Sequence, residues 1–226
     1  MNSPREDFLR RVCQAVSAGN RPGAASGIEP RERAGYQGAG PNPVQRFHDE
    51  IIAVGGWFHL VADPESCAAK VVELIQGKSS RHVLLGKGPV IDPLDLPKRL
   101  QDAGIEVISV DELTQESCRE SFFTADIGIS GVDYLVAETG TVVLHSGLEQ
   151  PRSLSLLPPV HIAIAERKQL MADLFDLFPS SNNEQSRTLP SCITFITGPS
   201  KTGDIELRLV TGVHGPGEIH VILIDR

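Results

Sequence analysis

Between Trp57 and Ser130 the chain alternates short apolar segments with segments of helical pattern, and this alternation limits the possible folds more than any other feature. Short apolar runs between polar, Gly-containing stretches predict buried strands, whereas apolar residues that recur every three or four positions predict helices. We predict strands over residues 57–61, 82–85, 105–110 and 127–130, and helices over residues 43–52, 64–77, 94–103 and 112–123. Short connections between alternating strands and helices favour an α/β fold, with a mostly parallel sheet that helices cover on both faces.

The helix that begins after Asp63 has the clearest end signals. The Asp63 side chain suits an N-cap, Pro64 fits the first helical position and Gly77 fits the helix end. One face of this helix repeats apolar residues every four positions, at Cys67, Val71 and Ile75. We therefore expect that face to be buried.

After residue 130 the apolar runs predict mainly strands. They span residues 134–137, 141–144, 160–165, 192–197 and 219–224. Residues 167–178 have the pattern of an amphipathic helix, which Pro179 would end. The polar run over residues 180–187 is either an active-site flap or a plain exposed loop.

The first 42 residues differ in composition from a domain that we place at residues 43–226. Residues 4–18 predict a short helix with Ser3 as its N-cap and an apolar stripe. Residues 19–43 are rich in Gly and Pro and bury too little apolar surface to become ordered by themselves. This arm either packs on a neighbouring subunit, as in a homo-oligomer, or is a plain disordered tail.

Charge and hydropathy argue against nucleic acid and membranes as partners. The 226-residue chain has a formal net charge of -8, whereas nucleic-acid-binding proteins usually have a basic excess on one face. No apolar run approaches the roughly 18 to 20 residues that cross a bilayer. The start, MNSPREDFLRR, lacks the apolar region of a secretory signal, so we expect a cytoplasmic protein.

The cysteines and histidines do not have the spacing of a metal or cluster site. The four cysteines include no C-x-x-C pair, so we expect them to be reduced and this chain to bind no iron–sulfur cluster. The seven histidines include no H-x-x-x-H pair, so we interpret them as core or turn residues and predict no metal site. The chain also lacks G-x-S-x-G, which disfavours a serine hydrolase.

The segment Glu138-Thr139-Gly140 lies between two predicted strands. A tight turn at Gly140 would hold the Glu138 carboxylate at the end of a buried strand. Glu138 is therefore either a functional carboxylate or a solvated turn residue. Because ligands of parallel sheets usually bind beyond the carboxyl ends of the strands, we expect Glu138, Ser130 and the loop at Gly86 to lie near one cleft.

A second polar segment, Gly198–Glu206, brings Ser200, Lys201 and Thr202 together within one turn. If Thr202 caps a short helix, its backbone N–H groups and Lys201 would form an anion site. The alternating apolar residues that follow suit a strand equally well. The turn that contains His214 comes shortly afterwards.

Two further loops are weaker candidates. Arg152 either binds a carboxylate or phosphate through two hydrogen bonds or forms a surface ion pair with Glu149. The loop Gly86-Lys87-Gly88 lacks the spacing of a phosphate-binding P-loop, so a simple turn is favoured there.

Two longer segments carry a family resemblance. The residues D-Y-L-V-A-E-T-G-T-V-V-L and I-T-G-P-S-K-T-G-D-I-E-L-R-L-V-T-G-V-H-G-P-G-E-I-H-V-I-L resemble the signature regions of the lactate-utilisation protein C family, whose module is called the LUD domain. The resemblance covers residues 43–226. Gly203 departs from the family pattern, where an alanine is expected.

The resemblance implies a three-layer α/β/α sandwich similar to the sugar-phosphate isomerase and CoA-transferase superfamily. It also implies a role in oxidising L-lactate to pyruvate with two iron–sulfur partner proteins. A relative in that system joins the same domain to cluster-binding cysteines; this chain has no such cysteines and resembles the cluster-free subunit.

The superfamily also suggests a chemical role for Glu138, because CoA-transferases use a strand-end glutamate, followed by a small polar residue and Gly, as a nucleophile. Our hypothesis is that Glu138 is that nucleophile or positions a ligand, and that a small anion such as lactate is held nearby. The residues expected to bind it are Thr139, Gly140, Arg152, Gly198, Ser200, Lys201, Thr202 and His214. Three functions stay open: a subunit of a lactate-oxidising complex, a stand-alone transferase or isomerase using Glu138, and a small-molecule sensor or assembly protein.

Overall fold

The computed structural model describes residues 4–19, 38–78, 80–114, 116–177, 190–203 and 209–226. The chain divides into two units, Met1–Gln37 and Gly38–Arg226. In the first unit the predicted helix is present as α1 (Pro4–Gly19), with Phe8, Leu9 and Val12 exposed. The proposed cap Ser3, and the arm over residues 20–37, lie outside the described residues.

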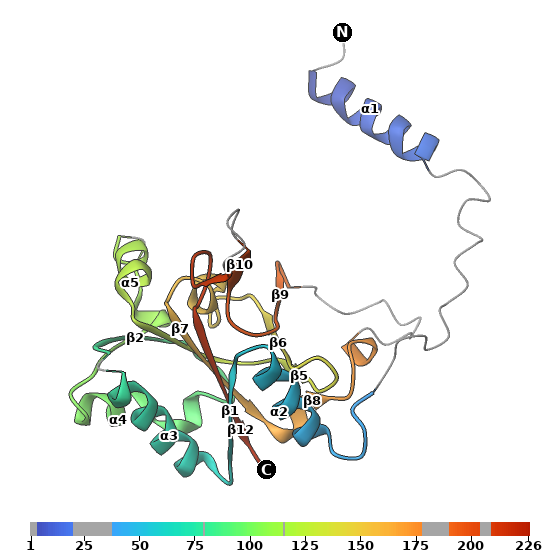
Figure 1. Ribbon diagram of the computed structural model, residues 1–226. Coiled ribbons are helices and arrows are strands. Elements are labelled where there is room, and N and C mark those ends of the chain that lie inside the picture. Colours follow the sequence, from blue (N-terminus) through green and yellow to red (C-terminus); the bar gives the residue numbers. More distant parts are fainter. Residues whose placement is uncertain (1–3, 20–37, 79, 115, 178–189, 204–208) are drawn as a thin grey trace. The chain divides into compact units, whose positions relative to one another are not determined.

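A six-stranded parallel sheet forms the centre of the second unit (Figure 1). Its strand order is β1-β12-β7-β4-β2-β3, and every neighbouring pair in it is parallel. The strands are β1 (Trp57–Val61), β2 (His82–Leu85), β3 (Glu106–Ser109), β4 (Ile127–Gly131), β7 (Val160–Glu166) and β12 (Glu218–Ile224). The prediction of a mostly parallel sheet is therefore confirmed.

Helices cover both faces of this sheet, which confirms the predicted α/β/α layers. On one face, α3 (Pro64–Gly77) and α4 (Leu96–Asp102) enclose a core that includes Val71, Leu100 and Ile164. On the other face lie α2 (Pro43–Ala53) and α5 (Cys118–Thr124) (Figure 1). The predicted cap of α3 is present, because the Asp63 carboxylate accepts a hydrogen bond of 2.7 Å from the Ser66 N–H.

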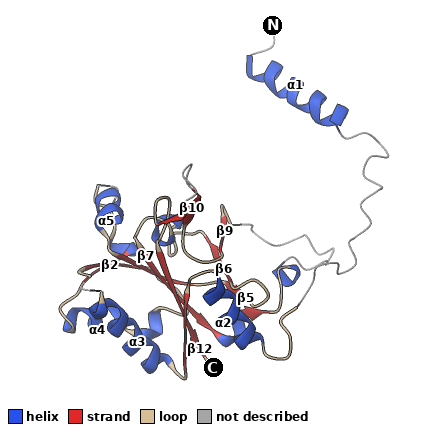
Figure 2. Cartoon of the chain, viewed as in Figure 1, coloured by secondary structure: helices blue, strands red, loops and turns tan. Residues whose placement is uncertain are grey.

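A second, four-stranded sheet packs on the same face as α2, with strand order β8-β5-β6-β9 (Figure 2). Its strands are β5 (Tyr134–Val136), β6 (Thr141–His145), β8 (Leu170–Met171) and β9 (Ile193–Ile196). Buried side chains of β5 and β6 meet the alanines of β7 in one core, at Leu135, Val142, Leu144, Ala163 and Ala165. The remaining hairpin consists of β10 (Lys201–Gly203) and β11 (Leu209–Thr211).

The predicted helix over residues 167–178 is wrong. The segment instead forms a 3₁₀ turn at Arg167–Gln169, the strand β8 and a second 3₁₀ turn at Phe175–Leu177. The Gln169 side chain bonds to the Glu166 backbone N–H and to the Val132 carbonyl, and β8 then pairs with β5. The Gln169–Val132 bond and the pairing of β8 with β5 are long-range, and they replace the local hydrogen bonds that a helix would need.

Three further 3₁₀ turns complete the described secondary structure: Asp92–Leu94, Val110–Glu112 and Arg152–Ser155. The second of these occupies the start of the helix predicted over residues 112–123, of which the part at α5 is helical. Among the described residues, none of the helices is both long and apolar enough to cross a membrane.

Candidate functional site

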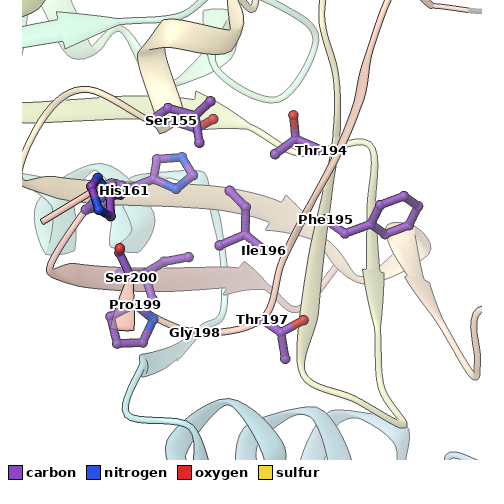
Figure 3. A pocket seen from close by; sticks show the side chains of 14 residues that line it. Ser155, His161, Thr194, Phe195, Ile196, Thr197, Gly198, Pro199 and Ser200 are labelled. Atoms are coloured by element: carbon purple, nitrogen blue, oxygen red, sulfur yellow. The ribbon is translucent and has the colours of Figure 1, made fainter. Parts of the chain in front are cut away.

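A cavity of about 210 Å³ lies at the amino ends of β7 and β12 (Figure 3). Side chains from four elements meet there: Ser155 from a 3₁₀ turn, His161 from β7, Thr194 from β9 and Ser200 from the loop before β10. In Figure 3 Phe195 points away from these groups, as expected for its position on β9 between Thr194 and Ile196. The cavity therefore lies between the two sheets.

His161 is the most unusual group in this cavity. Its side chain is fully buried, its Nε2 lies 2.8 Å from the Ser130 hydroxyl, and its Nδ1 has no hydrogen-bond partner among the described residues. Burial lowers the pKa of His161 to about 4, so the imidazole is neutral at physiological pH. A neutral imidazole with one nitrogen already bonded can offer the other nitrogen to a ligand.

The rest of the described lining contains no Lys, Arg, Asp or Glu. Hydroxyl groups come from Ser155, Thr194, Thr197 and Ser200. A ligand in this cavity would be held mainly by hydrogen bonds to hydroxyls and to His161. The volume is below the roughly 300–1,000 Å³ of pockets for drug-sized molecules, which indicates a small ligand.

Three of the residues expected to bind a ligand come together in this cavity: Gly198, Ser200 and His214. Gly198 has φ +87°, and a Cβ atom there would lie 2.7 Å from the Val54 Cγ2 at the end of α2. Glycine therefore lets the loop pass close to α2 and present Ser200 to the cavity.

The Glu138-Thr139-Gly140 segment forms the predicted tight turn between β5 and β6. Gly140 has φ +62°, and a Cβ atom there would lie 2.6 Å from the Ile51 backbone nitrogen of α2. Glu138 donates its backbone N–H to the Ala172 carbonyl over 3.1 Å, and it does not line the cavity. A role for its carboxylate stays a prediction.

Hydroxyl groups connect this turn to the cavity loop. Thr139 Oγ1 lies 2.7 Å from Thr141 Oγ1, which in turn lies 2.7 Å from Thr197 Oγ1. Thr197 lines the cavity and directly precedes Gly198. The two predicted segments are therefore linked by side chains, although they do not share one lining.

The other three predicted residues point elsewhere. Lys201 Nζ donates a hydrogen bond of 2.5 Å to the Val54 carbonyl of α2. Thr202 lies in β10, opposite Val210, so it does not cap a helix. Residues 204–208, over which the rest of that helix was expected, lie outside the described residues. Arg152 lines a smaller cavity beside Ser130.

A larger cavity, of about 610 Å³, lies at the carboxyl ends of β2 and β4. The loop after β2 lines it, yet the backbone N–H groups of that loop are already used: Gly86 donates to Ile129, Lys87 to Glu149 and Gly88 to the Asp92 carboxylate. The favoured interpretation of this loop as a simple turn agrees with these bonds. His145 lines the same cavity, with its Nδ1 3.1 Å from the Asp133 carboxylate.

Metal ligands do not cluster in the part of the chain that the structure describes, where no group of three or more His, Cys, Asp or Glu residues could hold an ion. The four cysteines are free; Cys67 is fully buried, and burial raises the pKa of its thiol to about 12.

Sequence reasoning missed Ser130 and His161 as partners. His161 occurs in the apolar run V-H-I-A-I-A, where it reads as a core histidine, and the two residues are 31 positions apart. The available signal was that both are polar residues within apolar strands.

Residues 44–224 match the family model described as the LUD domain. A lactate utilization protein C from Halalkalibacterium halodurans is 39% identical to this chain, over 98% of this chain and 97% of that protein. A lactate utilization protein C from Bacillus licheniformis is 27% identical, over 98% of this chain and 96% of that protein. A crystal structure of a DUF162 family protein from Deinococcus radiodurans matches this chain with a TM-score of 0.58 and 20% sequence identity. The match covers 80% of this chain and 96% of that protein, so the two share a fold. Because the domain match spans most of the sequence, this chain belongs to the LUD domain family.

Proposed function

We propose that this chain is the cluster-free subunit of a lactate-utilisation system that oxidises L-lactate to pyruvate together with iron–sulfur partner proteins. The observation that carries the proposal is its 39% identity, along 98% of its length, to a protein named lactate utilization protein C. A role in lactate utilisation is the broader part of the proposal. The reaction and the iron–sulfur partners are its more specific part.

Within this proposal, the cavity around His161 binds the small hydroxy acid. The substrate would lie beside the buried His161 ring, and its carboxylate would accept a hydrogen bond from the Ser200 hydroxyl. Buried hydrogen-bonding groups select strongly for a ligand that satisfies them, because an unpaired group costs about 1–3 kcal/mol. The arrangement supports a ligand with a hydroxyl or keto group beside a carboxylate.

We place the electron-accepting clusters on the partner proteins. Iron–sulfur clusters require several thiolates close together, and the four cysteines of this chain lie far apart in the sequence. Cys67 is moreover buried in the apolar core, where its high pKa disfavours the thiolate that a ligand must supply.

Growth and co-purification test the proposal. In a host that grows on L-lactate, deletion of this chain should abolish growth on L-lactate and leave growth on pyruvate unchanged, and re-expression should restore it. The tagged chain, purified from lactate-grown cells, should bring down proteins that carry iron–sulfur clusters, detected by electron paramagnetic resonance. Normal growth of the deletion strain on L-lactate would contradict the proposal.

A transferase or isomerase that uses Glu138 is a second candidate, favoured by the threonine chain that links the Glu138 turn to the cavity loop. The isolated protein would then exchange acyl groups between thioesters, and Glu138→Gln would abolish the exchange without unfolding the protein. Absence of exchange in the isolated wild-type protein, together with lactate-dependent growth, would reject this candidate in favour of the first.

A further inference from the structure

The strand β1 is an open edge of the six-stranded sheet. It is the first strand in the order β1-β12-β7-β4-β2-β3, and β12 is its one strand partner among the described residues. The backbone N–H and C=O groups on its outer side therefore have no strand partner in the part of the chain that the structure describes. Such an edge is a template on which a further strand can pair.

The side chains at this edge are apolar or neutral, and several are exposed. Trp57 is 53% exposed and Leu60 is 51% exposed, while Ile52, near the end of α2, is 43% exposed. The strand W-F-H-L-V contains no Lys, Arg, Asp, Glu or Pro. Natural proteins use charged residues and Pro to block pairing at open edges, and β1 lacks this protection.

The opposite edge of the same sheet is different. The strand β3 begins with the exposed Glu106, whose carboxylate lies 3.4 Å from the His82 Nε2. Its apolar residues Val107 and Ile108 are partly buried and pack against the cores of this chain. Of the two edges, β1 is therefore the one suited to pairing.

We propose that β1 pairs antiparallel with β1 of a second copy of this chain, about a two-fold axis at His59, so that the two parallel sheets join into one. In this register Trp57 lies opposite the partner's Val61 and Phe58 lies opposite the partner's Leu60, so apolar residues meet on both faces. Moving the axis by one residue, to Phe58 or Leu60, would instead place Trp57 opposite a histidine or an aspartate. The proposal is independent of any role in lactate oxidation.

The charges at the two ends of β1 favour a second copy as the partner. At the start of β1, the Lys201 Nζ donates to the Val54 carbonyl and would lie 3.6 Å from a Cβ atom on Gly55. Just beyond the end of β1 is the exposed Asp63, and its hydrogen bond from the Ser66 N–H holds the pKa of its carboxyl below the usual range. The proposed register puts Gly55 opposite the partner's Asp63. A two-fold axis therefore brings a lysine near an aspartate at each end of the paired strands.

The aromatic groups at the centre of β1 are compatible with this axis. The His59 Nε2 lies 3.1 Å from the His220 Nδ1, and burial, with the neighbouring His220, lowers the pKa of His59 to about 4. Both copies of His59 are therefore neutral at physiological pH, so like charges do not oppose each other at the axis. The Trp57 ring stacks on His220, with 5.9 Å between ring centroids, so its orientation is set before pairing and less entropy is lost.

The interface also adjoins the loop of the amino-end cavity. Lys201 directly follows Ser200, which lines that cavity. An ion pair between Lys201 and the partner's Asp63 would therefore help to hold this loop in place.

The first test is sedimentation of the full chain over a range of concentrations. The wild type should sediment as a dimer of 24.4 kDa chains. Leu60→Lys places two like charges within the interface and should raise the dissociation constant by about 100-fold. Leu148→Lys, at a loop residue that is 97% exposed, is the matched control and should remain a dimer. Circular dichroism checks that each variant is folded.

The second test uses the fluorescence of Trp57, the single tryptophan of the sequence. Its emission should move to shorter wavelength as the wild-type concentration rises through the dissociation constant, because the partner covers the exposed indole. Asp63→Asn keeps a residue that caps helices well and removes the charge, so it should raise the dissociation constant by a few-fold at low salt and have no effect at high salt.

Three results would overturn the proposal. The first is a wild-type chain that stays monomeric up to millimolar concentration. The second is a dimer whose formation leaves the Trp57 emission unchanged. The third is a dimer that persists in Leu60→Lys and is lost in Leu9→Lys, because Leu9 lies on the exposed stripe of α1 and the interface would then be on that helix. The growth test of the proposed function is not affected by any of the three.

Discussion

Two cavities of the main domain, one at the amino ends of β7 and β12 and one at the carboxyl ends of β2 and β4, differ in how their polar side chains are used. At the carboxyl ends of β2 and β4, the loop N–H groups already donate hydrogen bonds within the protein. The Lys87 Nζ lies 3.6 Å from the Asp111 carboxylate, and the His145 Nδ1 is paired with the Asp133 carboxylate.

At the amino ends of β7 and β12, His161 is fully buried, and its Nδ1 has no hydrogen-bond partner in the part of the chain that the structure describes. Gln150, which lines the carboxyl-end cavity, also has a buried Oε1 without a partner among the described residues. The comparison therefore teaches that a fully buried imidazole, rather than unsatisfied buried groups in general, sets the amino-end cavity apart.

This difference runs against the usual rule for α/β sheets, in which ligands bind beyond the carboxyl ends of the strands. The four-stranded sheet explains the departure. It adds β9 and the following loop above β7, so a second wall of hydroxyl groups is built over the amino end of the parallel sheet. The predictions below test whether this wall makes the amino-end cavity functional.

The largest expected effect comes from removing the imidazole at the amino-end cavity. His161→Gln should lower lactate-dependent turnover by about 10²–10⁴-fold, because an amide cannot exchange a proton as imidazole does. Turnover of the complex with L-lactate measures it. The matched variant at the other cavity, His145→Gln, should change turnover by no more than a few-fold, and equal losses in both variants would erase the distinction between the cavities.

Gly140→Ala should destabilise the turn that supports the amino-end cavity, by about 3 kcal/mol in the free energy of unfolding. The alanine would be strained at φ +62°, and its Cβ would meet the Ile51 backbone nitrogen at 2.6 Å. Urea unfolding measures the change. Gly147→Ala, at the edge of the other cavity, has no atom within 4 Å of the added Cβ and should stay within about 0.5 kcal/mol of wild type.

Burial of His161 predicts a loss of stability as the pH falls. Between pH 6.5 and about 4 the unfolded chain binds a proton at His161 that the folded chain excludes, since burial lowers the folded pKa to about 4. The resulting loss of unfolding free energy is about 3 kcal/mol. This loss is complete below about pH 4, and above pH 6.5 there is no loss. Urea unfolding at several pH values should show a shallower decline in His161→Gln than in wild type. Parallel curves for the two proteins would contradict the lowered pKa.

The smallest expected effect comes from the threonine chain. Thr141→Val removes two hydrogen bonds of 2.7 Å at a buried position and should cost about 1–2 kcal/mol of unfolding free energy. If these threonine hydrogen bonds also position the cavity loop, KM for L-lactate should rise by a few-fold. Thr124→Val, at an exposed helix end, is the control and should change neither quantity.

Local signals predicted the strands of the main sheet and the start of α3. The Asp63 cap and the apolar run of β1 act between residues that are adjacent or one helical turn apart, so the sequence displays them directly. The turn at Gly140 was predictable for the same reason. The helix expected over residues 167–178 failed because Gln169 and β8 find partners on distant segments.

The candidate site was predicted only in part. Gly198, Ser200 and His214 do share a cavity, but Lys201 turns to α2 and Glu138 stays outside the lining. Directions of side chains on neighbouring loop residues depend on what packs beside them, and α2 provides that surface here.

By itself, the sequence determined the strand and helix order, the caps and the membership of the LUD domain family, because these depend on short-range patterns and on signature segments. The tertiary structure alone decided which polar groups meet. Ser130 and His161 lie on separate strands of ordinary apolar pattern, and only the pairing of β4 with β7 brings them within 2.8 Å. The physical reason is that burial and unsatisfied hydrogen bonds are properties of packed neighbours, which no single segment contains.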